Sequence, residues 1–221
     1  MSKVSVLIPV FNERDSVGEL LNRVRAVPLE MEVIVVDDHS TDGTAEVLAG
    51  LDIDDVVVVT HPENRGKGAA VRTALGVATG DVVVIQDADL EYSPSDLPAM
   101  IEPIEQGRTK VVYGFRDLSD QEWIRRLGNQ FLTFATNFLY GSRLKDMETC
   151  YKMVDLELMR SLDLQADRFD IEVEITAKLL KSQQEIVQVP VSYYPRLERK
   201  LIPWIDGPHS LWGLIKYRFL R

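Results

Sequence analysis

The stretch VVVIQDADLEY, residues 82–92, decides the fold, because a run of apolar residues leads directly into two aspartates. The run from Val82 to Ile85 is typical of a buried strand. Burying an unpaired carboxylate is costly, so Asp87 and Asp89 must either find a partner or point out of the fold into a site. Residues two apart on an extended segment face the same side, where these carboxylates repel unless a cation lies between them.

The residues before this stretch alternate between strand and helix patterns. Apolar runs at 4–10, 32–38 and 55–61 predict strands, and each is followed by a segment with capping residues or helical spacing. This alternation predicts an α/β fold with a mostly parallel central sheet flanked by helices. Because the Val and Ile runs do not alternate with polar residues, we expect both faces of the sheet to be buried.

The pattern loosens after residue 93. It predicts strands at 110–116 and 185–195 and helices at 95–106, 121–141, 169–182 and 207–220. The 121–141 helix carries an aromatic stripe along one side, made of Trp123, Leu127, Phe131, Phe134 and Phe138. We expect this stripe to pack in the core, although it could instead line the path of a lipid tail. No repeat or low-complexity linker interrupts the chain, which favours a single domain.

The composition excludes several classes of protein. The 221 residues are 45% hydrophobic and 27% charged, as in a globular protein, and the net charge of −10 argues against a nucleic-acid partner. The segment 196–221 holds six basic and two acidic residues, which suits either anionic lipid or a solvated tail. A single cysteine, Cys150, fits a reducing compartment. With no signal-peptide pattern and no apolar run of about 18 residues, we expect a cytoplasmic protein, soluble or peripheral to a membrane.

Polar residues follow each of the first four predicted strands. They are Pro9, Phe11, Asn12 and Glu13 after the first, Asp37 and Asp38 after the second, residues 64–68 after the third, and Asp87 and Asp89 after the fourth. Ligands of open parallel sheets bind outside the carboxyl ends of the strands, so we expect one shared pocket. The carboxylates of Asp87 and Asp89 suit Mg²⁺ or Mn²⁺, which complete their shells with water and substrate phosphates.

The glycine-rich segment NRGKGAAVR, residues 64–72, follows the third strand. It lacks the Ser or Thr that a phosphate-binding loop places after Lys67, and Val71 stands where a dinucleotide-binding motif has glycine. Its glycines permit close backbone approach, so Lys67 or Arg65 could neutralise a diphosphate at a helix N-terminus. A glycine turn with ordinary surface cations fits equally well.

A family resemblance emerges from these motifs taken together. The segments VLIPVFNE (6–13), VIVVDDHSTDGT (33–44), NRGKGAAVRTALGVATGDVVVIQDADLEYSP (64–94) and VVYGFR (111–116) resemble those of family 2 glycosyltransferases of GT-A fold. The later segments DMETCYKMV (146–154), RFDIEVEITAKL (168–179) and VPVSYYPRLERKLIPWIDG (189–207) are similar to the branch of dolichol-phosphate mannosyltransferases and polyprenyl-phosphate glucosyltransferases. The resemblance implies one Rossmann-like domain over 1–221, with a nucleotide-binding half (1–92), an acceptor-side half (93–206) and a C-terminal amphipathic helix (207–221).

The resemblance also implies roles for individual residues. Pro9, Phe11, Glu13 and Asp38 would surround the nucleotide base and ribose, and Asp87, Ala88 and Asp89 would form the family's DxD motif, which holds the metal on the donor diphosphate. Arg116, Arg196 and Lys200 would match basic residues near the donor and acceptor phosphates, with Lys67 as a further cation. The chain departs from the pattern at Thr149–Lys152, where the mannosyltransferases commonly have SGFR, so that Lys152 replaces an arginine.

The implied reaction is an inverting displacement that moves a hexose from GDP-mannose or UDP-glucose to a polyprenyl or dolichyl phosphate. Asp89 and Arg116 are catalytic candidates for stabilising the leaving diphosphate. A hydroxyl acceptor would in addition need a carboxylate as base, for which Asp146 and Glu148 are candidates, although both could be ion-paired surface residues. Glu172 and Glu174 fit a solvated helix face or a supporting role better. A non-catalytic subunit that binds a sugar nucleotide is a third alternative.

The implied acceptor places the protein at the cytoplasmic face of a membrane. The last helix mixes Leu211, Trp212 and Phe219 with Lys216 and Arg218, which suits a helix lying on a membrane or packing against the sheet or a partner. The resemblance leaves open a homo-oligomer or a membrane-anchoring subunit as partner.

Overall fold

The structure is a computed structural model that describes residues 2–51, 55–119, 123–196 and 203–219, with the backbone alone at 203–209. Its centre is a seven-stranded sheet in the order β3-β2-β1-β4-β6-β5-β7. The strands are β1 (Val4–Val10), β2 (Met31–Asp37), β3 (Val56–Thr60), β4 (Val82–Ile85), β5 (Val111–Arg116), β6 (Lys152–Asp155) and β7 (Ile186–Val191). Neighbouring strands are parallel except at β6, which runs antiparallel to β4 and β5. The predicted α/β fold with a mostly parallel sheet is confirmed.

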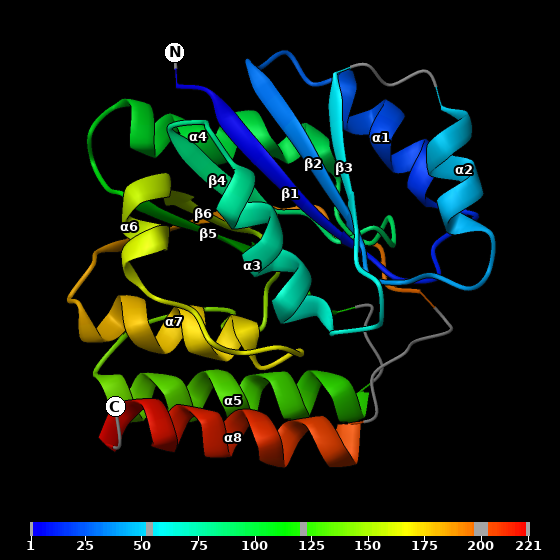
Figure 1. The fold of residues 1–221 in the computed structure, drawn as a ribbon. Coiled ribbons are helices and arrows are strands. Elements are labelled where there is room, and N and C mark those ends of the chain that lie inside the picture. The colour runs from blue at the N-terminus through cyan, green and yellow to red at the C-terminus, as the bar shows by residue number, and fades with distance from the viewer. Residues whose placement is uncertain (1, 52–54, 120–122, 197–202, 220–221) are drawn as a thin grey trace.

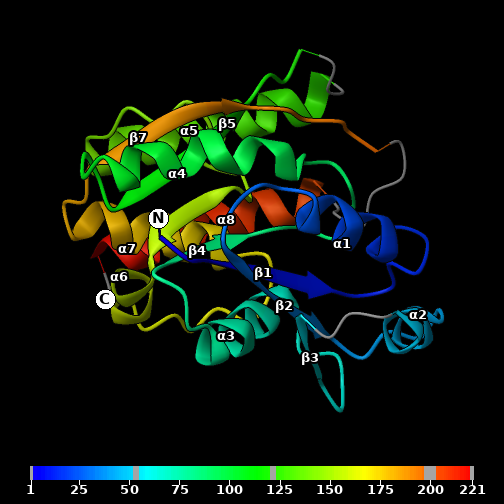
Figure 2. The ribbon, with the colours of Figure 1, turned by 90° about the horizontal axis from the view of Figure 1, so that it is seen from above.

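Helices cover both faces of this sheet (Figures 1 and 2). They are α1 (Val17–Arg25), α2 (Thr44–Gly50), α3 (Lys67–Val77), α4 (Leu97–Glu105, after a 3₁₀ turn at Pro94–Asp96), α5 (Trp123–Tyr140), α6 (Leu156–Ser161), α7 (Ile171–Lys181) and α8 (Pro203–Phe219). Helices α1, α2 and α4 share one core with the sheet, and α3, α6 and α7 share the other. Helices α5 and α8 lie side by side outside α7 (Figure 1).

Both faces of the central strands are buried, as the apolar runs predicted. In β1, Val6 and Ile8 join the core under α1, whereas Leu7 points to the core under α3. The prediction is wrong for β3, where Val57 and Val58 are 47% and 41% exposed. This strand forms the edge of the sheet, so its side chains reach beyond the covering helices.

The prediction that the aromatic stripe of α5 packs in the core is also wrong. Trp123 is 68% exposed and Phe138 is 78% exposed, and the other three members of the stripe are exposed as well. The helix instead buries its polar side, because Asn129 donates a hydrogen bond to Asp146 and Thr133 accepts one from the Met147 backbone N–H. Anchoring these polar groups turns the stripe outward. Among the described residues, none of the helices has both the length and the hydropathy needed to cross a bilayer.

Strand β6 and helix α6 are not anticipated by the sequence patterns. Each is short, and the four residues of β6 begin at the end of the segment DMETCYKMV and extend to Asp155. Their position matters, because β6 joins β4 of the first half of the chain to β5 of the second. The sheet therefore runs continuously across the predicted boundary near residue 92, and the division into two functional halves stays a prediction.

Candidate active site

The first four strands, β1 to β4, run parallel, so their carboxyl ends lie together at one end of the sheet. The residues after these strands contact one another there. Asp38 donates its backbone N–H to the carbonyl of Val10, and Asn12 donates its own to the Ser40 hydroxyl. The pocket expected from the sequence thus has its components in one place.

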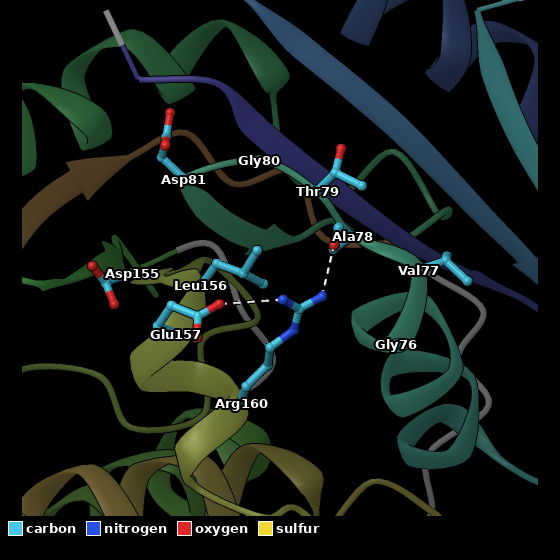
Figure 3. A pocket seen from close by; sticks show the side chains of 10 residues that line it. All are labelled: Gly76, Val77, Ala78, Thr79, Gly80, Asp81, Asp155, Leu156, Glu157 and Arg160. Atoms are coloured by element: carbon cyan, nitrogen blue, oxygen red, sulfur yellow. Dashed lines mark hydrogen bonds and ion pairs between the residues drawn. The ribbon is translucent and has the colours of Figure 1, made fainter.

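A cavity of about 650 Å³ lies at the opposite end of the strands, beside the amino end of β4 (Figure 3). Its one guanidinium group, that of Arg160, already donates to Glu157 and to the Ala78 carbonyl. Open sheets bind their ligands at the carboxyl ends of the strands, which are the other end from this cavity. Because Arg160 is also engaged within the chain, we do not assign the active site to this cavity.

Asp87 and Asp89 follow β4 with the buried Ala88 between them. Burial raises the pKa of Asp89 to about 7, and the negative charges of Asp87 and Glu91 add to this effect. The ionised form of Asp89 is thus disfavoured in the protein alone, and a bound divalent cation would stabilise it. Within the described part of the chain, no cluster of three potential metal-ligating residues forms. The donor set fits Mg²⁺ or Mn²⁺ that completes its shell with water and donor phosphates.

Lys67, at the start of α3, lies behind Asp87. Its Nζ is 2.7 Å from Asp87 Oδ1 and 2.5 Å from Glu172 Oε1 on α7. Burial alone would lower the pKa of Lys67, but the charges of Asp87 and Glu172 outweigh burial and raise it well above its usual value. Lys67 stays protonated and holds Asp87 in place. That it also meets a donor diphosphate stays a prediction.

The glycines around Lys67 allow another part of the chain to pack closely against them. A Cβ atom on Gly66 would collide with the carbonyl of Asp167, and one on Gly68 with the carbonyl of Ala166. Ala69 also donates its backbone N–H to the Asp167 carbonyl. The close backbone approach that these glycines permit is therefore to the chain's own segment before α7, which brings Glu172 against Lys67.

Arg196 connects the ends of β1 and β4. Its guanidinium donates to Glu13 Oε2 at 3.0 Å and to the backbone carbonyl of Asp89, and its backbone N–H donates to Glu91 Oε1. The structure thus brings Arg196 and Glu13 to the Asp87–Asp89 segment, and their contacts with a nucleotide or a phosphate stay a prediction. The other predicted cation of this region, Lys200, lies outside the described residues.

The residues predicted around the nucleotide lie beside this cluster. Pro9 is half-buried at the end of β1, and Phe11 is 37% exposed just after it. Asp38 is buried, and its carboxylate accepts hydrogen bonds from the His61 ring and from the backbone N–H groups of Arg65 and Gly66. Asp38 therefore fixes the glycine-rich loop, and a contact of this carboxylate with a nucleotide stays a prediction.

A second charged group lies at the end of β5. Arg116 donates to both carboxylate oxygens of Asp146, at 2.6 and 2.9 Å, and its guanidinium lies over the rings of Tyr92 and Tyr193. Burial opposes ionisation of Asp146, but the Arg116 charge prevails and holds the pKa of Asp146 below its usual value. Asp146 is a weak base in this pairing.

Glu148 and Lys152 lie next to this pair. Burial raises the pKa of Glu148 to about 7, with the charge of Glu172 contributing, and its Oε1 finds no hydrogen-bond partner in the described structure. Lys152 is fully buried and donates to the backbone carbonyls of Met147 and Thr149. Through these two hydrogen bonds Lys152 fixes the loop that carries Glu148. A contact of Lys152 with substrate, as the replaced arginine implies, stays a prediction.

Three residues of the site escape the sequence reasoning. The Glu91 carboxylate accepts a hydrogen bond from the Tyr193 hydroxyl, and His61 Nδ1 lies 2.6 Å from Asp38 Oδ1. The signal for Glu91 was present, because it continues the spacing of Asp87 and Asp89 by two more residues. Nothing in the sequence marks Tyr193 as a partner of Arg116.

Comparison with known proteins identifies the family of the chain. Residues 5–162 match the family described as "Glycosyl transferase family 2". Glycosyltransferase AglJ of Haloferax volcanii is 30% identical over 92% of this chain and 68% of its own length. The undecaprenyl-phosphate 4-deoxy-4-formamido-L-arabinose transferase of Proteus mirabilis is 32% identical over 66% of this chain. The chain spans 47% of the length of that second relative.

Solved structures confirm the fold. Glucosyl-3-phosphoglycerate synthase from Mycobacterium tuberculosis, in complex with Mn²⁺, UDP and phosphoglyceric acid, superposes with a TM-score of 0.74 at 20% identity. The superposition covers 100% of this chain and 80% of that one. This is the GT-A architecture that the family resemblance implied. The match of residues 5–162 shows that the chain belongs to glycosyltransferase family 2.

Proposed function

We propose that this glycosyltransferase moves a hexose from a nucleotide sugar, GDP-mannose or UDP-glucose, to a polyprenyl or dolichyl phosphate with inversion at the anomeric carbon. The observation that carries the proposal is the acidic pair Asp87 and Asp89 at the carboxyl edge of the sheet, with Arg196 beside it. Relatives whose names specify undecaprenyl-phosphate and dodecaprenyl-phosphate reactions support the choice of acceptor.

On the donor side, Asp87 and Asp89 would hold Mg²⁺ or Mn²⁺, which lowers the barrier by neutralising charge on the leaving diphosphate. Arg196 is oriented by Glu13 and Glu91 and shares this task as a fixed cation. Lys67 keeps the Asp87 carboxylate in one orientation. The exposed ring of Phe11, at the end of β1, is suited to stack on the nucleotide base.

On the acceptor side, Arg116 would orient the lipid phosphate. Asp146 and the rings of Tyr92 and Tyr193 hold its guanidinium, so little side-chain entropy is lost when it binds. A phosphate oxygen is already anionic at neutral pH and attacks the anomeric carbon without a base. A single displacement of this kind inverts the configuration there.

A hydroxyl acceptor is the second candidate, and Glu148 is the observation that favours it. With a pKa of about 7, this carboxylate is poised to take a proton from an attacking hydroxyl, whereas Asp146 is not. Under the favoured function Glu148 has no proton to remove. The two candidates therefore differ in what they require of this residue.

The test is transfer of labelled sugar from GDP-mannose and from UDP-glucose to undecaprenyl and dolichyl phosphate. Labelled product that partitions into the organic phase, depends on Mn²⁺ or Mg²⁺ and carries the inverted linkage supports the proposal. Transfer to water-soluble hydroxyl acceptors alone would favour the second candidate. Binding of a sugar nucleotide without either transfer or metal-dependent hydrolysis would point to a non-catalytic subunit and overturn both.

A further inference from the structure

Helices α5 and α8, which lie side by side, both carry exposed apolar side chains. We call these side chains the α5–α8 face and define it as the aromatic stripe of α5 together with Trp212 and Phe219 of α8. The two α8 residues are 58% and 69% exposed, and in the stripe Phe134 and Phe138 stack on each other at 6.5 Å. The helices form the outermost layer of the fold (Figure 1).

The two helices hold each other in this arrangement. The Tyr140 hydroxyl donates to the Leu214 carbonyl at 2.8 Å, and Arg218 donates to the Leu139 carbonyl at 3.0 Å. The inward sides of both helices join the core, through Leu132 of α5 and Leu214 of α8. The exposed side chains are therefore held by two helices packed on the core, and groups of exposed apolar side chains of this kind mark an interaction site.

The charge around this face is opposite to that of the whole chain. The sequences of α5 and α8 hold four basic residues, Arg125, Arg126, Lys216 and Arg218, and one acidic residue, Asp206. The chain as a whole carries a net charge of −10. An anionic surface would thus attract this face and repel the acidic remainder of the protein. The protein would therefore approach such a surface with α5 and α8 toward it.

We propose that the α5–α8 face binds the surface of an anionic lipid bilayer, with both helices lying in the headgroup layer. Aromatic and aliphatic side chains with basic residues beside them are the composition of helices that lie in this layer. A second copy of the chain suits the face less well, because a two-fold contact would set its basic residues against their own copies.

The same helix that carries the aromatic stripe also reaches the acceptor side of the active site. Asn129, on the inward side of α5, donates to Asp146, which in turn holds Arg116. The bilayer surface and the proposed phosphate-binding arginine are therefore on opposite sides of one helix. The inference deepens the proposed function by locating where the lipid acceptor would be met, and rests on it to that extent.

Sedimentation with vesicles tests the inference without any measurement of activity. We expect the chain to bind vesicles of phosphatidylcholine with phosphatidylglycerol more tightly than vesicles of phosphatidylcholine alone. The variant Phe131→Ser/Phe134→Ser/Phe138→Ser should bind at least about tenfold more weakly. Arg126→Gln/Lys216→Gln should lose about fivefold per charge, and only on anionic vesicles.

The control is Val57→Ser/Val58→Ser, which removes exposed apolar side chains from the edge strand β3 and should leave vesicle binding unchanged. All substituted positions are at the surface, and a thermal melt confirms that each variant folds. Absence of vesicle binding, or binding that the Phe variant retains, overturns the inference. So does a wild-type dimer that the Phe variant converts to a monomer without vesicle binding.

Wild-type transfer to a prenyl phosphate dispersed in detergent separates this inference from the proposed function. A chain that binds anionic vesicles but does not transfer sugar in detergent retains the membrane face and loses the proposed reaction. A chain that transfers sugar in detergent but does not bind vesicles supports the proposed reaction and overturns the membrane face.

Discussion

The ammonium group of Lys67 lies between two carboxylates, 2.7 Å from Asp87 Oδ1 and 2.5 Å from Glu172 Oε1. One positive charge is thus shared between a residue of the DxD motif and a residue of α7. Glu172 offsets the positive charge that Lys67 places beside Asp87, so the segment keeps the negative charge that a divalent cation needs. The pair sets both the position and the effective charge of Asp87.

Glu172→Gln should therefore weaken Mn²⁺ binding, by roughly tenfold, because the Lys67 charge is then balanced by Asp87 alone. Titration calorimetry with Mn²⁺ measures the effect. Glu157→Gln is the control, since Glu157 lies on α6 with 82% of its side chain exposed and should leave the affinity unchanged. An unaltered affinity in a folded Glu172→Gln variant would show that Glu172 does not regulate the charge at Asp87.

The contact between Gly68 and the Ala166 carbonyl predicts a stability difference between two glycines of one helix. Gly68→Ala should destabilise the fold by about 2 kcal/mol or more, because the new Cβ must displace backbone. Gly76→Ala, also in α3, meets nothing within 4 Å and should stabilise by up to about 1 kcal/mol. Urea unfolding of both variants provides the comparison. Equal effects would contradict the packing of α3 against residues 166–167.

Asp89→Asn should abolish transfer and remove the Mn²⁺-dependent thermal shift with GDP or UDP. The amide keeps the shape of the side chain but removes the charge that would ligate the metal. Because burial already opposes ionisation of Asp89, the variant should fold at least as stably as the parent near neutral pH. Asp117→Asn, at a surface position, controls for general effects of charge. Normal turnover by Asp89→Asn would refute the assignment of the metal site.

The early strands and the location of the acidic pair could be read from the sequence because both depend on local pattern. Runs of Val and Ile identify β1, β2 and β4, and parallel strands then gather their ends at one edge. Asp87 and Asp89 occupy the place that this reasoning gave them. Arg196 and Glu13 also meet there, a contact that neither the patterns nor the family resemblance predicted.

The features that the sequence could not predict depend on partners far along the chain. Lys67 and Glu172 are 105 residues apart, and nothing local indicates that they pair. Asn129 and Thr133 lie on the inward side of α5, where they form hydrogen bonds with residues 146 and 147. These bonds orient the helix so that the aromatic stripe faces outward, against the prediction from the apolar pattern. The burial of Lys152 is a further such feature, because its short strand β6 lies in the middle of the sheet and encloses it.

Glu148→Gln separates the two acceptor classes. Under the proposed function the variant keeps most of its turnover, because a lipid phosphate needs no base. A hydroxyl acceptor would instead require the carboxylate, and turnover would fall by about 10²-fold or more. Asp146→Asn cannot make this distinction, because it leaves buried Arg116 without its carboxylate and costs about 3 kcal/mol of stability under either function. The measurement is the rate of labelled transfer at saturating donor.

The same Glu148→Gln variant should also change how stability depends on pH. Burial raises the pKa of Glu148 to about 7, whereas an unfolded glutamate titrates near about 4.3. Between these values the folded chain binds a proton that the unfolded chain does not, so this group adds stability as pH falls and costs stability above pH 7. Glutamine has no such charge to bury. The Tm of Glu148→Gln should therefore exceed that of the parent at pH 8, and the difference should shrink toward pH 5. A difference that stays constant across this range would mean that Glu148 titrates normally, which would also remove the main argument for its role as a base.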